Sequence, residues 1–204
     1  MKKRILLPLL CLVAVLLGGV LAILTIPWGF AREVSREEQA LRLQVVHTAE
    51  SWLGIREEDG SHRPIIDRYN AQVPLPRSYA VSYEDPWCAA FESVVALECG
   101  LSDIIPPECG CDPQIALFQN LGCWVEADDY VPLPGDLIYY DWDVKQQGSS
   151  TGWSDHVGIV VGIKWPFVKV IEGNKDDAVA FRIIPIGHRY IRGYAMPDYS
   201  GSHK

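Results

Sequence analysis

A cysteine near the predicted start of a helix is the first candidate for chemistry. Cys88 stands in the segment D-P-W-C-A-A-F, one turn inside a helix that Asp85 and Pro86 are expected to open as N-cap and first helical residue. The partial positive charge at a helix N-terminus favours the thiolate, which is the nucleophilic form of cysteine. A buried structural thiol is the competing interpretation, because cysteine is among the most buried residue types. The position alone leaves both interpretations open.

A histidine and two polar residues further along the chain favour the catalytic interpretation. His156 opens a predicted strand, and Gly158 on the same face leaves room beside the imidazole. Glu172 and Asn174 lie two residues apart in the extended segment I-E-G-N, so we expect both side chains on one face. Either could accept the ring N–H of His156 and leave the other ring nitrogen to take the thiol proton, although E-G-N is also an ordinary turn.

The elements that must position these side chains are helices first and strands afterwards. Ser35 and Glu38 form a capping box, which opens an amphipathic helix that Gly54 ends. The later elements follow from the apolar pattern and the turn residues between them: helices at 65–71, 87–99 and 112–122, and strands at 137–142, 157–163, 167–171, 179–184 and 190–195. This order predicts an α+β fold in which N-terminal helices pack on an antiparallel β-sheet.

Six short segments resemble motifs of one protein family and occur in the same order as in that family. They are W-L-G-I-R-E (52–57), P-W-C-A-A-F (86–91), P-L-P-G-D-L-I-Y-Y-D-W (132–142), D-H-V-G-I-V (155–160), V-I-E-G-N (170–174) and I-R-G-Y-A-M-P (191–197). Together they span about residues 38–199 with their surroundings and resemble the CHAP family of cysteine- and histidine-dependent amidohydrolases/peptidases. These are peptidoglycan hydrolases related to the NlpC-type papain-like enzymes, and the order cysteine, histidine, polar acceptor is similar to that of papain.

The resemblance implies a role for each candidate residue. Cys88 would be the nucleophile, His156 the base, and Glu172 with Asn174 the pair that orients the imidazole. It also implies a papain-like CHAP fold and an amidase or endopeptidase that cleaves peptidoglycan peptides through a thioester acyl-enzyme. We expect no cofactor and no metal. The alternative is a catalytically silent, membrane-tethered module of the same fold that binds the wall or acts as a scaffold. Asp136, in P-G-D, is interpreted as structural, with its carboxylate satisfying backbone donors.

The N-terminus has the pattern of an export signal or a membrane anchor. Three basic residues at 2–4 precede 22 uncharged residues at 5–26. A removable signal has an apolar region of about 7–15 residues, whereas a membrane span needs about 20. The length therefore favours a single-pass anchor with the catalytic domain outside the cytoplasm, and the alternative is secretion after cleavage behind Ala31. Residues 1–31 are assigned to the anchor or signal peptide, and residues 32–204 to the hydrolase domain.

The charge of the chain argues against nucleic acid as a partner. There are 18 basic and 26 acidic residues, a net charge of −8, and three of the basic residues precede the apolar run. So acidic a domain has no electrostatic footprint for nucleic acid, and no glycine-rich phosphate loop is present. The resemblance predicts peptidoglycan peptides as substrate, and the N-terminal helix predicts contact with the membrane. Because the sequence has no repeated wall-binding module, a wall-remodelling or secretion apparatus is expected as a further partner.

Four further cysteines and an acidic loop leave alternatives open. The cysteines outside the apolar run and the candidate nucleophile are Cys99, Cys109, Cys111 and Cys123. Disulfides and free thiols are equally compatible with an exported domain, and a metal site is less favoured because C-G-C is short for zinc. Asp141, Asp143 and Asp155 bracket a Gly/Ser loop that does not match an EF-hand, so a solvated loop is favoured over a calcium site.

Overall fold

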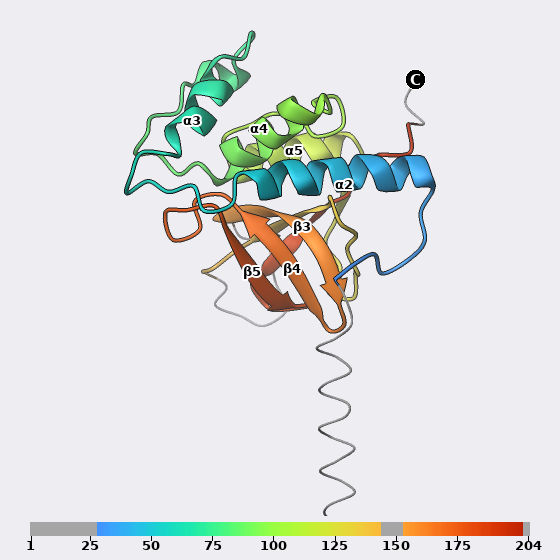
Figure 1. Cartoon of the computed structure of the whole chain (residues 1–204). Helices are drawn as coiled ribbons and strands as arrows, with labels where there is room; N and C mark the ends of the chain where they lie inside the picture. The colour runs from blue at the N-terminus through green and yellow to red at the C-terminus, as the bar shows by residue number, and fades with distance from the viewer. Residues whose placement is uncertain (1–27, 144–152, 202–204) are drawn as a thin grey trace, which may run out of the picture.

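Four α-helices gather on one side of a six-stranded β-sheet in the computed structural model, which describes residues 28–143 and 153–201 (Figure 1). The described part of the chain confirms the predicted α+β class, with helices packed on an antiparallel sheet. The expected N-terminal membrane or signal helix lies outside the described residues. Within them, no helix is both long enough and apolar enough to cross a membrane.

The first two helices lie where the sequence predicts them. α2 (Arg36–Ser51) begins after Ser35, whose hydroxyl accepts a hydrogen bond from the backbone N–H of Glu38 at 3.0 Å. This bond is half of the predicted capping box. α3 (Arg63–Asn70) covers the region expected at 65–71 and packs against α4 (Cys88–Cys99). A short 3₁₀ helix (Pro76–Ser78) lies between them in the chain.

The start of α4 differs from the prediction and makes Cys88 the first residue of the helix. The N-cap is Trp87, which makes no side-chain capping bond, and Cys88 is the first helical residue. The Asp85 carboxylate instead accepts hydrogen bonds from the Ser82 N–H at 2.8 Å and from the Tyr79 hydroxyl at 2.9 Å. The prediction of Asp85 as N-cap is therefore wrong, because the preceding loop uses its carboxylate.

The start of α5 (Cys111–Asn120) also differs from the prediction, because this helix begins before its Asp112-Pro113 signal. Its N-cap is Gly110, and Asp112 lies in the first turn of the helix. One Asp112 carboxylate oxygen accepts the Ser154 N–H at 3.0 Å, which ties the start of α5 to the segment that leads into the strand beginning at His156. α4 and α5 therefore both begin with a cysteine.

The sheet is antiparallel throughout and has the strand order β1-β6-β2-β3-β4-β5. Its strands are β1 (Trp124–Val125), β2 (Leu137–Tyr140), β3 (His156–Lys164), β4 (Phe167–Glu172), β5 (Ala180–Pro185) and β6 (Ile191–Ala195). Five of the six strands were predicted. β1 was missed, because two residues are too few to show an alternating pattern.

Two apolar cores hold the layers together. The larger one lies between the helices and the sheet, and it includes Val45, Phe91, Ile115, Tyr139 and Ile171. The smaller one is formed by strand residues such as Tyr140 and Val170. Because alternate residues of a strand point to opposite faces, β2 contributes Tyr139 to one core and Tyr140 to the other.

A buried ion pair joins α2 to the turn before β2. Asp136 is fully buried, and its carboxylate accepts hydrogen bonds from the Leu133 N–H at 2.8 Å, the Tyr130 hydroxyl at 2.8 Å and the Arg42 guanidinium at 2.7 Å. The interpretation of Asp136 as a structural residue that satisfies a backbone donor is confirmed.

Candidate active site

The first residue of α4 carries the candidate nucleophile. Cys88 is 4% exposed, and the backbone N–H of Ala89 is among the groups that lower the pKa of its thiol. The N–H groups in the first turn of a helix have no partner within the helix, and they carry partial positive charge. The same donors can stabilise an oxyanion that forms when the sulfur attacks a carbonyl carbon.

The imidazole of His156 is held by a buried carboxylate on the neighbouring strand. His156 is the first residue of β3, and its Nε2 lies 3.1 Å from Oε2 of Glu172, the last residue of β4. Gly158 makes this contact possible, because a Cβ there would lie only 2.6 Å from Cγ of Glu172. The space predicted beside the imidazole is therefore occupied by the Glu172 side chain. Since an ionised carboxylate only accepts, Nε2 carries the proton and Nδ1 is left for the thiol.

The surroundings of Cys88 and His156 shift their pKa values toward a charged pair, lowering that of the thiol and raising that of the imidazole. Hydrogen bonds from Cys111 and from His156 hold the pKa of Cys88 well below its usual value, although burial opposes this. Burial alone would lower the pKa of His156, but its hydrogen bonds to Cys88 and Glu172 and their charges raise it to about 9. At neutral pH this arrangement favours a thiolate beside an imidazolium.

Glu172 has a second cationic partner that the sequence analysis missed. Arg182 Nε donates to Glu172 Oε1 at 2.6 Å, and its guanidinium lies over the rings of Tyr140 and Trp142, 5.5 and 4.9 Å from their centroids. Tyr140 in turn stacks on the His156 ring at 5.9 Å. Although burial opposes ionisation, the bonds from His156 and Arg182 lower the pKa of Glu172.

Only the strand register could have identified Arg182. Ala180 lies directly opposite Glu172, which makes Arg182, two residues further on, its diagonal neighbour across β4 and β5. Diagonal neighbours lie within reach of long side chains, but the sequence does not fix which residues face each other.

Asn174 does not share a strand face with Glu172. β4 ends at Glu172, and Asn174 lies in the following turn with a φ of +54°. With its amide oriented to suit its neighbours, the Asn174 nitrogen donates to Glu57 Oε1 and the oxygen accepts from the Trp87 N–H, both at 3.2 Å. Glu57 Oε1 also accepts the Trp87 indole N–H at 2.7 Å. Asn174 thus contacts the residue before Cys88 rather than the imidazole.

The described cysteines are free thiols, and one of them contacts Cys88. Cys111 Sγ lies 3.8 Å from Cys88 Sγ. The other three have different partners: Cys99 contacts Thr48 Oγ1, Cys109 accepts from Arg77, and Cys123 contacts the Leu121 carbonyl. Among these five cysteines, the structure therefore contains none of the possible disulfides. No local pattern in the sequence indicates that Cys111 lies beside Cys88.

The acidic residues around the Gly/Ser loop bind backbone groups. Asp155 accepts the Trp142 N–H at 2.7 Å, and Asp141 accepts the Asp143 N–H at 2.9 Å. Residues 144–152 of this loop lie outside the described chain. Among the described residues, no group of three or more His, Cys, Asp or Glu side chains could hold a metal ion.

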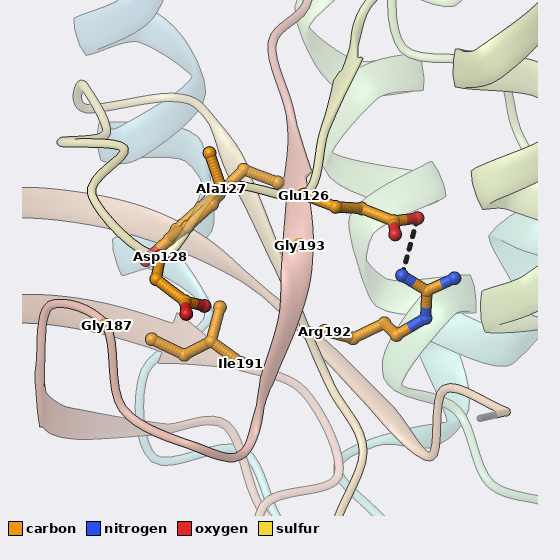
Figure 2. Close-up of a pocket in the computed structure, with 8 residues that line it drawn as sticks. Glu126, Ala127, Asp128, Gly187, Ile191, Arg192 and Gly193 are labelled. Carbon is orange, nitrogen blue, oxygen red and sulfur yellow. Dashed lines mark ion pairs between the residues drawn. The ribbon is translucent and has the colours of Figure 1, made fainter. Parts of the chain in front are cut away.

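A separate pocket lies at the β1–β6 side of the sheet (Figure 2). Figure 2 shows Glu126 and Arg192 pointing toward one another as an ion pair beside Gly193, with Asp128 and Ile191 on the other side of the strand. None of the four predicted site residues lines this pocket.

Comparisons with known proteins do not assign the chain to a family. No protein-family model and no curated protein matches the sequence. Among solved structures, the chain is similar to the crystal structure of Ly7917 with the hydrolyzing product of MDP, at 12% identity and a TM-score of 0.41. The match covers 76% of this chain and 62% of that one, so this chain spans less than two thirds of its length. A similarity of this extent establishes neither a shared fold nor a shared activity.

Proposed function

We propose that the described domain is a CHAP-type cysteine amidohydrolase that cleaves an amide bond in the peptide part of peptidoglycan, outside the cytoplasm. The observation that carries the proposal is the series of contacts from the first turn of α4 through Cys88 and His156 to the buried Glu172. This series supports a thiolate held beside an imidazolium. The choice of peptidoglycan as substrate rests on the six segments that resemble the CHAP family.

In the proposed reaction, the Cys88 sulfur forms a bond to the amide carbonyl carbon. The N–H groups in the first turn of α4, including that of Ala89, stabilise the negative charge that develops on the carbonyl oxygen. His156 gives its Nδ1 proton to the leaving nitrogen as the C–N bond breaks, which leaves a thioester. Neutral His156 then takes a proton from water, the water oxygen attacks the thioester, and the thiolate leaves.

We also propose that residues 5–26 remain attached and anchor the domain to the membrane. Gly29 exchanges two backbone hydrogen bonds with Ile163 of β3, at 3.2 and 2.9 Å, and Trp28 packs against Gly162. Cleavage behind Ala31 would remove these contacts from the domain. They therefore favour retention over the secreted alternative.

Digestion of purified peptidoglycan by the full chain in detergent tests the activity. Mass spectrometry of the released muropeptides should identify the cleaved amide. Cys88→Ala should lower the rate on the order of a thousandfold or more, because only binding and the oxyanion donors remain. Cys99→Ala removes a half-buried thiol at the far end of α4 and should leave the rate unchanged.

Two outcomes would overturn the proposal. An intact rate in Cys88→Ala would exclude a cysteine nucleophile. Wild-type protein that binds peptidoglycan without releasing muropeptides would favour the silent wall-binding or scaffolding module.

A further inference from the structure

Two helices converge on one pair of sulfur atoms. Cys88 and Cys111 are the first residues of α4 and α5, and their Sγ atoms lie 3.8 Å apart. Both are buried, at 4% and 8% exposure. The described part of the chain has three other cysteines, and each contacts a different group. Cys111 is thus the thiol placed to react with a modified Cys88.

The two sulfurs are not equivalent. The hydrogen bond between them lowers the pKa of Cys88 and raises that of Cys111, and burial adds to the rise at Cys111. The pair therefore holds one proton, with the charge on Cys88. A thiolate is the form of cysteine that oxidants attack, and a neighbouring thiol is the group that condenses with the product.

We propose that Cys111 is a resolving cysteine, which converts peroxide-oxidised Cys88 into a reversible Cys88–Cys111 disulfide. In the first step, the Cys88 thiolate attacks hydrogen peroxide, the O–O bond breaks, and Cys88 becomes a sulfenic acid while hydroxide leaves. In the second step, the Cys111 sulfur attacks the Cys88 sulfur, the S–O bond breaks, and water leaves with the thiol proton. Over both steps, one thiolate and one thiol lose two electrons and one proton, and hydrogen peroxide is reduced to one hydroxide ion and one water molecule.

The geometry requires only a small movement. A disulfide needs an S–S separation of about 2.05 Å, so the sulfurs must approach by roughly 1.8 Å. Rotation about the Cα–Cβ bonds, with adjustment of two helical first turns, is the movement that the proposed disulfide requires. Because Cys111 already contacts Cys88, the condensation is intramolecular and gains the rate advantage of proximity.

The consequence is protection of the reactive sulfur. A sulfenic acid that meets further peroxide becomes sulfinic and then sulfonic acid, and thiols do not reverse these states. A disulfide stops this progression and is restored by a thiol reductant. The loss of activity in the oxidised state rests on the proposed function, whereas the formation of the disulfide does not.

Peptide mapping under non-reducing conditions tests the proposal on the full chain in detergent. The reduced protein is treated with hydrogen peroxide, and free thiols are then blocked with iodoacetamide. We expect a cross-linked pair of peptides that contain Cys88 and Cys111 in the wild type and in Cys99→Ser. In Cys111→Ser we expect sulfinic and sulfonic Cys88 instead, and about tenfold less iodoacetamide-reactive Cys88 after dithiothreitol treatment.

The outcomes separate this proposal from the proposed function. A cross-link without muropeptide release would uphold the resolving cysteine and reject the hydrolase. Equal recovery of Cys88 in the wild type and Cys111→Ser, or a cross-link from Cys88 to another cysteine, would overturn the resolving cysteine. Cys111→Ala provides a second variant if the serine variant does not fold, and the wild-type map decides alone if neither folds.

Discussion

Glu172 lies between two cations, and each of its oxygens holds one of them. Oε2 contacts His156 and Oε1 contacts Arg182, while the side chain is fully buried. A buried carboxylate with two charge-assisted hydrogen bonds is strongly held in its ionised form. Together with the Cys88 sulfur, this charge therefore lets His156 remain an imidazolium although the surrounding protein excludes water.

Glu172→Gln should lower kcat/KM by roughly ten- to a hundredfold. The amide keeps the shape of the side chain but removes its charge, so the pKa of His156 falls from about 9. Because the rate is lost when the imidazolium loses its proton, the alkaline limb of the pH profile should move to lower pH. The measurement is kcat/KM against pH on a soluble muropeptide.

Asn174→Ala provides the contrast to this variant. Asn174 contacts Glu57 and the N–H of Trp87, so its loss should loosen the start of α4 and lower the rate without moving the alkaline limb. A nearly inactive Asn174→Ala together with a near-normal Glu172→Gln would assign the orienting role to Asn174 instead.

Glu92 is another buried carboxyl, one turn after Cys88, and it has no hydrogen-bond partner among the described residues. Burial, with smaller contributions from the charges of Cys88 and Glu172, raises its pKa well above the usual value. The folded protein therefore keeps a proton that the unfolded chain releases above about pH 4.5. Protonated Glu92 therefore contributes its full stabilisation below that pH. This contribution is lost as the pH rises through the pKa that Glu92 has in the folded protein.

Glu92→Gln should remove this loss of stability. Between pH 5 and pH 7, the free energy of unfolding of the wild type should fall relative to the variant by up to about 1.4 kcal/mol per pH unit. Urea unfolding at several pH values measures the difference. Glu84→Gln, at an exposed loop position, should follow the wild type. Parallel pH profiles for wild type and Glu92→Gln would show that Glu92 is ionised in the folded protein.

At the scale of elements, one glycine sets the distance between α4 and the end of β4. A Cβ at Gly173 would lie 2.5 Å from Cβ of Phe91. Gly173→Ala should therefore push the turn after Glu172 away from α4 and destabilise the protein by about 1–3 kcal/mol. Thermal unfolding and kcat/KM should both fall. Gly29→Ala, where the added Cβ has no atom within 4 Å, is the matched control.

The sequence predicts elements well where a pattern lies within one segment. The helix after Ser35 and the strand that begins near His156 both follow from local signals, and the structure contains both. The Asp85 carboxylate is taken by its own loop, so its local signal for a helix start fails. Arg182 and Cys111 could not be found in this way, because their partners depend on strand register and on the packing of two helices.

For the whole molecule, the location of the chain in the cell tests the proposed membrane anchor. We expect the full-length protein to remain with membranes through a high-salt wash, and the domain to be digested by protease added from outside the cytoplasm. The physical reason is the uncharged run at 5–26 with basic residues on its N-terminal side. A chain recovered from cells with Arg32 as its first residue would contradict retention.

β3 connects the candidate active site to the segment that follows the apolar N-terminal run. His156 begins the strand, and Ile163 near its end pairs with Gly29, three residues after the apolar run. At about 3.3 Å per residue, the two positions are separated by up to about 23 Å. With a retained anchor, β3 would therefore hold His156 within a fixed distance of Gly29, just beyond the proposed anchor. Peptides would then be cut only where they come within reach of a site tethered in this way, so the geometry of the envelope would select substrates before chemistry does.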